Sequence, residues 1–411
     1  MIKIFPFRAI MPPPAVASQI ACEPYDVIST EEARERSAGN PLSFLHVVRS
    51  EIDLPAATDP YAQSVYDTAA SNLERMIGDG HLIEQPRPGM FIYRQTFEGR
   101  EQYGIVCTCD AEQYRQDLIK KHEKTRPDKE DDRTRHMTVS SAHAEPVFLT
   151  FRDTDEVNLL IQSDSKGVPQ IDFVAADKVR HSIWPVADPA KYTQAFGKVP
   201  ALYIADGHHR TAGGERAAAK RQAKNPQHTG NEEYNRILSV VFPASQLKIL
   251  AYNRVVKDLN GLNGEALISK LSQVGQIGET KNPVPNRPGT VCIYFAGKWF
   301  AFSFPSSSID TSDPINSLDV SLLQSRILEP ILGVGDPRTD KRIGFVGGIR
   351  GTAELQRLVD SGQMGVAFSM FPTSIEQLLN VSDAGKIMPP KSTWFEPKLR
   401  SGLFVHRFEN F

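Results

Sequence analysis

Short apolar segments separated by polar turns run along the whole 411-residue chain, and they predict many short strands and helices without an internal repeat. The clearest pair, 90–97 and 102–109, flanks Glu98-Gly99-Arg100 and predicts a β-hairpin. Further strands are expected at 146–152, 171–174, 199–204, 236–243, 291–295, 299–304, 344–346, 364–370 and 402–406, and helices after residues 29 and 59 and at 211–222, 317–331 and 374–379. This alternation predicts a mixed α/β (α+β) fold whose strand order the sequence leaves open.

Four segments are expected from this pattern. Residues 1–145 form an N-terminal α/β region, and 146–258 form a core around a strand, a polar turn and an alanine-rich helix. Residues 259–310 are expected to be an inserted subdomain, and 311–411 a C-terminal α/β region that returns to the functional site. A chain of this length accommodates two to three domains.

Composition narrows the classes of function. Lys and Arg total 47 and Asp and Glu total 49, a net charge of −2, so no overall positive field recruits nucleic acid or anionic lipid. The four cysteines are too few for a disulfide scaffold, and Cys107 and Cys109 are expected to be reduced structural thiols on one strand face. Neither a signal peptide nor an apolar run of about 20 residues is present. We therefore expect a cytoplasmic protein without a membrane segment.

The segment 205–210, Ala-Asp-Gly-His-His-Arg, is the strongest candidate for chemistry. It joins an apolar strand to a helix, and the first amides of a helix carry a partial positive charge that suits a phosphate group. Two imidazoles and a guanidinium would add donors to phosphate oxygens, while Asp206 would bind Mg²⁺ or accept a proton. The plain alternative is an aspartate helix cap with a turn glycine and surface polar residues.

Three further segments combine reactive side chains, and each also has a structural interpretation. In 121–127, Glu123 could be a base and Lys124 and Arg126 phosphate ligands, or the segment is a solvated charged loop. In 388–398, Lys391, Ser392 and Thr393 offer a cation and two hydroxyls on a loop that prolines stiffen, although structural turns have similar composition. In 23–29, Tyr25 and Asp26 either face a cleft or form the turn before a capped helix.

Taken together, the segments 24–29, 122–125, 205–210 and 388–402 resemble, in order and spacing, a bacterial and archaeal family known as domain of unknown function 1015 (DUF1015). The resemblance spans nearly the whole chain. The family label by itself implies no activity.

The turn at 205–210 also resembles the phosphate-binding turn of the ParB/sulfiredoxin superfamily, which includes chromosome-partition CTPases, sulfiredoxin and kinases of free L-serine. This second resemblance implies a ParB/sulfiredoxin-like core and a small-molecule kinase that transfers a phosphoryl group to a hydroxyl metabolite, with L-serine as the named example. Sulfiredoxin chemistry is not expected, because 205–210 contains no cysteine. The alternatives are a non-catalytic, nucleotide-binding regulator of ParB-like type and a hydrolase.

The expected partners are a small-molecule substrate and a phosphoryl donor (ATP, ADP or pyrophosphate) with Mg²⁺. Nucleic acid is not expected, and the oligomeric state, a homodimer included, is left open. The expected site residues are Glu123 and Asp206 as catalytic groups, with Asp206 also as metal ligand; Gly207, His208, His209, Arg210, Lys124 and Arg126 for phosphate; and Tyr25, Asp26, Lys391, Ser392 and Thr393 for substrate.

Overall fold

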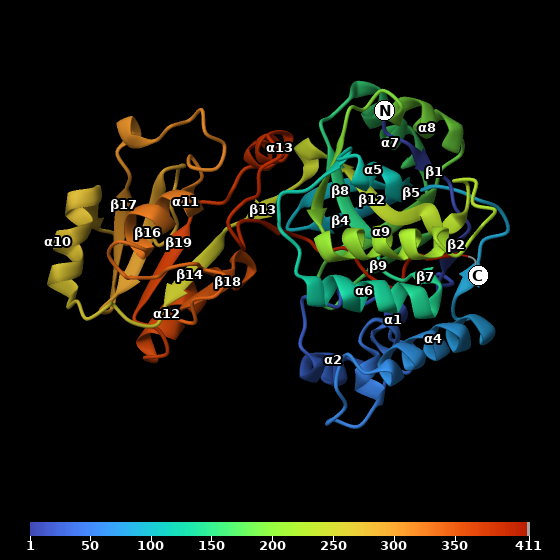
Figure 1. The fold of residues 1–411 in the computed structure, drawn as a ribbon, viewed down its shortest axis with the longest axis horizontal. Coiled ribbons are helices and arrows are strands. Elements are labelled where there is room, and N and C mark those ends of the chain that lie inside the picture. Colours follow the sequence, from blue (N-terminus) through green and yellow to red (C-terminus); the bar gives the residue numbers. More distant parts are fainter. Residues whose placement is uncertain (409–411) are drawn as a thin grey trace. The chain divides into compact units, whose positions relative to one another are not determined.

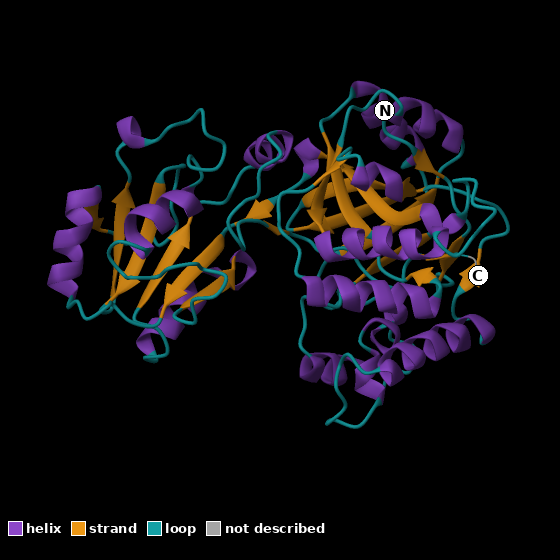
Figure 2. Ribbon diagram, viewed as in Figure 1, coloured by secondary structure: helices purple, strands orange, loops and turns teal. Residues whose placement is uncertain are grey.

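The computed structural model describes residues 1–408, which divide into two compact units. Unit 1 contains Met1–Leu247 and the described residues from Pro397 onward, and unit 2 contains Lys248–Glu396. Both units combine sheets with helices, so the predicted mixed α/β class is confirmed (Figure 2).

A nine-stranded mixed sheet forms the centre of unit 1 (Figure 1). Its strands in spatial order are β6 (Ile119–Lys120), β11 (Leu202–Asp206), β8 (Val147–Phe151), β12 (Arg236–Pro243), β5 (Arg100–Asp110), β4 (Phe91–Phe97), β10 (Arg180–Pro185) and β9 (Ile171–Val174), with β1 (Ile4–Phe5) also paired to β5. The predicted hairpin is confirmed as β4 and β5. Its turn places Glu98 and Gly99 at φ 50° and 74°, as a two-residue turn between twisted strands requires.

The helices of unit 1 are α1 (Ala17–Ile20), α2 (Thr30–Ser37), α3 (Leu45–Val48), α4 (Gln63–Gly78), α5 (Ala111–Arg115), α6 (Pro127–Ser140), α7 (Asp155–Asp164), α8 (Pro189–Phe196) and α9 (His208–Gln222). Of these, α1, α5, α7, α8 and α9 contact strands of the nine-stranded sheet. Helices α6 and α9 lie side by side, and α4 packs against α6 (Figure 1). Gly213 permits this approach, since a Cβ there would lie 2.9 Å from Cβ of Arg133.

A second, four-stranded sheet in unit 1 contains strands from the N-terminal part of the chain and from its C-terminal part. Its order is β3 (Ile83–Glu84), β2 (Ala9–Met11), β21 (Val405–Arg407) and β7 (Ala142–His143). The C-terminal strand β21 therefore pairs with strands from the first 150 residues of the chain.

Unit 2 is built on a six-stranded sheet with the order β15 (Gln276–Glu279), β17 (Lys298–Ser303), β16 (Thr290–Phe295), β19 (Val366–Met370), β14 (Tyr252–Val256) and β18 (Ile343–Gly347). Its helices are α10 (Gly264–Val274), α11 (Asp319–Leu323), α12 (Gly351–Asp360) and α13 (Ile375–Asp383). The chain enters and leaves unit 2 through a paired β13 (Ile249–Leu250) and β20 (Trp394–Phe395).

These limits differ from the four segments expected from the sequence. The compact unit begins at Lys248, and it includes 311–396 as well as 259–310. The reason is that β18 and β19 pair with β14 and β16, so strands on both sides of residue 310 complete one sheet.

Several element boundaries also differ from prediction. The second helix begins at Gln63 instead of beside Asp59, and the expected helix 317–331 is a short α11 followed by a π-helical turn at Gln324–Leu328. The helix expected from Thr211 begins at His208. All four cysteines are free and buried, and Cys107 and Cys109 lie two residues apart on β5, the strand arrangement that the sequence predicts.

Candidate functional site

The turn at 205–210 joins β11 to α9, as predicted, and Gly207 makes it. Asp206 ends the strand, and Gly207 is the residue before the helix, so the interpretation of Asp206 as the helix cap is wrong. Gly207 has φ 94° and ψ 34°, a left-handed conformation that glycine adopts without a steric penalty. A Cβ there would lie 2.9 Å from Nε of Arg210. Both the backbone and the space therefore require glycine at this position.

Arg210 lies buried beneath this turn, with 2% of its surface exposed. Its Nη1 donates to the Pro146 carbonyl at 2.5 Å, and its Nη2 lies 3.4 Å from Oδ2 of Asp206. Burial opposes the charge, but Asp26 and Asp206 outweigh it and raise the pKa of the guanidinium. Its Nε has no hydrogen-bond partner among residues 1–408 and lies next to the bare backbone of Gly207.

Asp206 carries the fixed negative charge of the site. Lys398 Nζ lies 3.3 Å from its Oδ2. Lys398 is 192 residues further along the chain, and it also belongs to unit 1. Burial works against ionisation, yet Lys398 and Arg210 lower the pKa of Asp206 to about 2. One quarter of this side chain is exposed. Asp206 is therefore an ionised, accessible oxygen ligand and a weak proton acceptor.

Asp26 is a second carboxylate near Arg210, and its pKa is shifted in the opposite direction from that of Asp206. Its side chain is exposed, but the protein around it desolvates the carboxylate and raises its pKa. Arg210 opposes this shift, and Asp206 and Glu145 add to it. The structure therefore brings Asp26 and Asp206 to the same guanidinium, as two carboxylates whose pKa values move in opposite directions.

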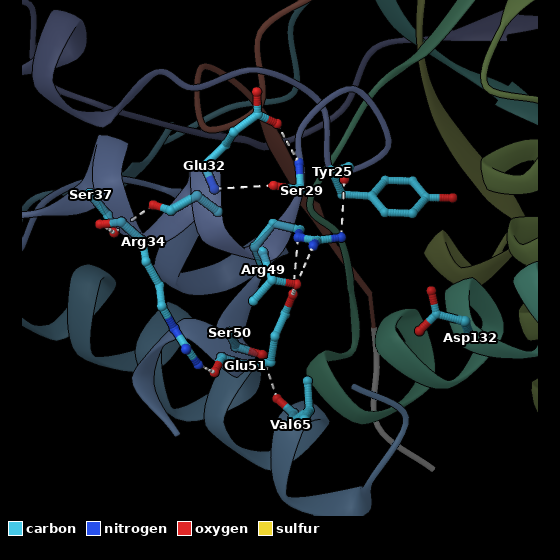
Figure 3. A network of polar contacts seen from close by, with 12 residues as sticks. Tyr25, Ser29, Glu32, Arg34, Ser37, Arg49, Ser50, Glu51, Val65 and Asp132 are labelled. Carbon is cyan, nitrogen blue, oxygen red and sulfur yellow. Dashed lines mark hydrogen bonds and ion pairs between the residues drawn. The ribbon is translucent and has the colours of Figure 1, made fainter. Parts of the chain in front are cut away.

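Buried polar contacts hold the loop that carries Asp26. The amide of Tyr25 donates to Oε1 of Glu145 at 3.0 Å, and the guanidinium of Arg133 lies over the Tyr25 ring, 3.8 Å from its centre. Arg133 also binds Glu145 at 3.2 Å. From the other side, Arg49 donates to the Tyr25 carbonyl at 3.3 Å (Figure 3). Tyr25 thus positions the loop and has its ring covered.

His208 and His122 form a buried pair at the start of α9. Their ring centres are 4.5 Å apart in an edge-to-face arrangement, and burial lowers the pKa of each to about 3. The His122 amide approaches Nε2 of His208 at 3.5 Å, which places the proton of the neutral His208 ring on Nδ1. That Nδ1 lies 3.9 Å from Oε2 of Glu123, whose side chain is 40% exposed.

His209 joins the same turn to the segment 121–127. The Arg126 amide donates to its Nε2 at 3.2 Å, so the remaining proton lies on Nδ1. Burial lowers the pKa of His209, and Glu123 and Asp26 oppose the shift. The Arg126 side chain is largely exposed and pairs with Asp128 at 2.7 Å, while Lys124 is exposed. The backbone of this segment therefore lies at the site, whereas its two basic side chains extend toward solvent.

Lys391, Ser392 and Thr393 belong to unit 2, and their expected contact with the turn stays a prediction. Ser392 is buried and donates to the Pro389 carbonyl at 2.6 Å, so its hydroxyl stabilises the loop. Lys391 has φ 55° and lies 5.7 Å from the centre of the Tyr252 ring.

Four residues at the site were missed as functional candidates: Lys398, Glu145, Arg133 and His122. Lys398 and His122 stand within two of the segments singled out above, and their charge and ring were the available signals. Glu145 and Arg133 show no motif, because their importance comes only from burial next to Tyr25.

Magnesium would need ligands from outside the protein. Among residues 1–408, no three His, Cys, Asp or Glu side chains gather closely enough to hold a metal ion. Mg²⁺ in phosphoryl-transfer sites is usually bound by one or two carboxylates together with substrate phosphates and water. The ionised, accessible carboxylate of Asp206 fits that smaller requirement.

The family model "Protein of unknown function (DUF1015)" matches residues 4–321. The chain belongs to the DUF1015 family. It matches no curated protein sequence.

Solved structures that match this chain include the following three. A conserved hypothetical protein from Pyrococcus furiosus is 14% identical, with a TM-score of 0.35, and the match covers 73% of this chain and 95% of that one. A free serine kinase in complex with AMP is 13% identical, with a TM-score of 0.35 and coverage of 71% and 86%. SbnI from Staphylococcus aureus, with a C-terminal truncation, is 11% identical, with a TM-score of 0.38 and coverage of 73% and 87%.

Within the described part of this DUF1015 chain, no helix is both long and apolar enough to cross a membrane.

Proposed function

We propose that this DUF1015 protein is a phosphotransferase that moves a phosphoryl group from ATP, ADP or pyrophosphate to the hydroxyl of a small metabolite, with L-serine as the first acceptor to test. One observation carries the proposal. At the start of the 15-residue helix α9, Nε of the buried Arg210 lies against the backbone of Gly207, which carries no side chain, and this Nε has no hydrogen-bond partner among residues 1–408. A phosphate at this helix terminus would meet the first amides of α9 and the charge of Arg210.

Neutral imidazoles complete the donor set. Nδ1 of His208 and His209 carry the ring protons, so each can donate one hydrogen bond to a phosphate oxygen. Lys398 and Arg210 supply the positive charge that a developing negative charge on the phosphoryl group requires. In this proposal the buried Arg210 lies beneath the turn and stabilises the phosphate through the electric field of its guanidinium.

Two of the three carboxylates suit proton transfer. Asp206, with a pKa of about 2, serves as the Mg²⁺ ligand. Glu123, exposed next to Nδ1 of His208, and Asp26, whose pKa is raised, are better acceptors for the proton of the substrate hydroxyl. Mg²⁺, when bound with the donor, would neutralise phosphate charge.

Phosphorus NMR tests the proposal directly. Purified full-length protein is mixed with Mg²⁺, each donor in turn and a pool of hydroxyl metabolites that includes L-serine. We expect a new phosphomonoester signal. Asp206→Asn should lower its rate of formation by about 100-fold or more, because a fixed charge at the reacting group is removed. His209→Ala should also lose turnover, since it removes one donor.

A matched control distinguishes the loss of a group at the site from a general loss of folding. Asp172→Asn makes the same chemical change on β9, at the far edge of the sheet from β11, where Asp172 pairs with Arg180. It should keep the wild-type rate, and circular dichroism should show all three variants folded. Wild-type turnover in a folded Asp206→Asn variant would refute the site.

A nucleotide-binding regulator is the second candidate, and the neutral histidines favour it. Burial lowers the pKa of His208 to about 3, so the turn offers hydrogen bonds with little positive charge at the first helical residue. Such a turn suits binding without transfer. Donor binding in calorimetry without any change of phosphorus signals would support the regulator, whereas donor loss without an ester would indicate a hydrolase.

A further inference from the structure

Unit 2 contains a cavity of about 680 Å³ that the proposed function does not use. It lies between the segment 306–319, the start of β16 and helix α13. Its volume is within the range of small-molecule sites, roughly 300–1,000 Å³. Its wall combines apolar residues, such as Ile309 and Pro314, with hydroxyl and carboxamide side chains, which are Ser306, Thr311, Ser312, Ser317, Gln377 and Asn380.

Asp319, the first residue of α11, is the acidic group in the cavity wall. Only 9% of its surface is exposed. Its Oδ1 accepts a hydrogen bond from the Gly289 amide at 2.9 Å, while Oδ2 has no hydrogen-bond partner among residues 1–408. A buried carboxylate oxygen without a donor is costly, so each such oxygen in a native structure needs an explanation.

The charges around the cavity do not neutralise Asp319. Burial raises its pKa to about 6, and only the Gly289 amide is found to oppose that shift within the described residues. Next to the lining segments, Lys386 pairs with Asp313 at 3.4 Å, and Arg326 donates to the hydroxyl of Ser308 at 2.5 Å. At neutral pH, Asp319 is therefore mostly an anion in the wall of a cavity whose other lining residues are uncharged, some polar and some apolar.

We propose that this cavity binds a small hydroxylated amine, with the protonated amino group at the carboxylate of Asp319 and the hydroxyl and carboxamide groups of the wall around the rest of the ligand. A compact ammonium group supplies three donors and the opposite charge, which together satisfy the buried carboxylate. This inference is independent of phosphoryl transfer, because every residue in it belongs to unit 2.

Binding is measured on the full chain by calorimetry and by the ¹⁵N-resolved NMR shift of the Gly289 amide. The probes are ethanolamine and 1,4-diaminobutane, and ethylene glycol is the uncharged comparison. We expect both amines to bind and to shift Gly289, with ethylene glycol at least about tenfold weaker. If neither amine binds at millimolar concentration, or if the glycol binds as well as the amines, the proposal is wrong.

Asp319→Asn isolates the charge. It keeps an oxygen that can accept from Gly289 and removes the anion, so amine affinity should fall by about tenfold or more. The matched control is Asp336→Asn, which changes an exposed aspartate paired with Arg338 in the same unit and should leave affinity unchanged. Equal amine affinity in the folded Asp319→Asn variant would overturn the proposal.

The wild-type protein provides a second test that does not depend on the variant folding. Since Asp319 must be ionised to bind an ammonium group, lowering the pH from 7.5 to 5 should weaken amine binding by about tenfold, as the ionised fraction falls to about one in eleven at one unit below its pKa. The amines stay protonated throughout this range. Constant affinity between the two pH values would contradict the role of Asp319.

Discussion

At the residue scale, burial decides the chemistry of the turn more than residue type does. The sequence predicts His208 and His209 as donors beside a guanidinium, and the structure makes both rings neutral and places Arg210 under the backbone. The same surroundings shift the pKa values of two aspartates in opposite directions. Lys398, 3.3 Å away, lowers the pKa of Asp206, whereas desolvation raises that of Asp26. Acid–base roles in this site therefore follow from neighbours that are distant in sequence.

Gly207 offers a sharp test at this scale. Gly207→Ala should lower the free energy of unfolding by about 2–4 kcal/mol, since it combines a left-handed backbone with a Cβ placed 2.9 Å from Nε of Arg210. Gly230→Ala is the matched control, because Gly230 has φ 90° but nothing within 4 Å of the added Cβ. Urea unfolding should show a loss of about 1 kcal/mol in the free energy of unfolding for this control. Equal losses in the two variants would mean that the contact with Arg210 costs nothing.

At the element scale, the capped helix α2 follows the Tyr25–Asp26 loop and limits where that loop ends. Ser29 accepts from the Glu32 amide at 3.2 Å, and Glu32 accepts from the Ser29 amide at 2.7 Å, the reciprocal capping box that the sequence predicts (Figure 3). Arg49 then joins this helix to the loop, since it donates to the Thr30 hydroxyl at 2.7 Å and to the Tyr25 carbonyl.

Removal of this cap should be measurable. Ser29→Ala should lower the free energy of unfolding by about 1 kcal/mol, because the Glu32 amide loses its acceptor at the helix start. Glu31→Gln, one residue away in the same first turn, keeps the cap and should cost only a few tenths of a kcal/mol. Urea unfolding of both variants checks the difference, and a Ser29→Ala variant as stable as Glu31→Gln would contradict the contribution of the cap.

At the scale of the whole molecule, unit 2 is a long insertion in unit 1. The chain enters and leaves unit 2 through β13 and β20, where Ile249 pairs with Phe395, so the two ends of the insertion are adjacent. The residues after it complete unit 1: β21 enters the four-stranded sheet, Lys398 pairs with Asp206, and Ser401 donates to Glu145 at 3.1 Å.

This arrangement predicts how the molecule can be divided. Residues 248–396 expressed alone should unfold cooperatively in urea, because their sheet is complete within those limits. Residues 1–247 joined to 397–411 by a short Gly/Ser linker should also fold. Residues 1–247 alone should be markedly less stable, since they lack β21 and remove Lys398 from Asp206 and Ser401 from Glu145. Equal stability of the last two chains would contradict this account.

Local patterns in the sequence determined those features that depend on neighbours in the chain. Glu98-Gly99 specified the hairpin turn, and Ser29 with Glu32 specified the start of α2, because turn and cap geometry arise within a few residues. The mixed α/β class and the turn at Gly207 followed from the same kind of signal. The start of α9 was misjudged by three residues, because the histidine-rich turn gives no strong helix signal.

Only the tertiary structure decided which distant groups meet and what charge they carry. Lys398 reaches Asp206 across 192 positions of sequence, and Glu145 holds Tyr25 from 120 positions away. The extent of unit 2 depends on β19 pairing with β14 and β16, which no local pattern specifies. Burial is likewise a property of the packed molecule, and it lowers the pKa of His208 and leaves Oδ2 of Asp319 without a hydrogen-bond donor among residues 1–408.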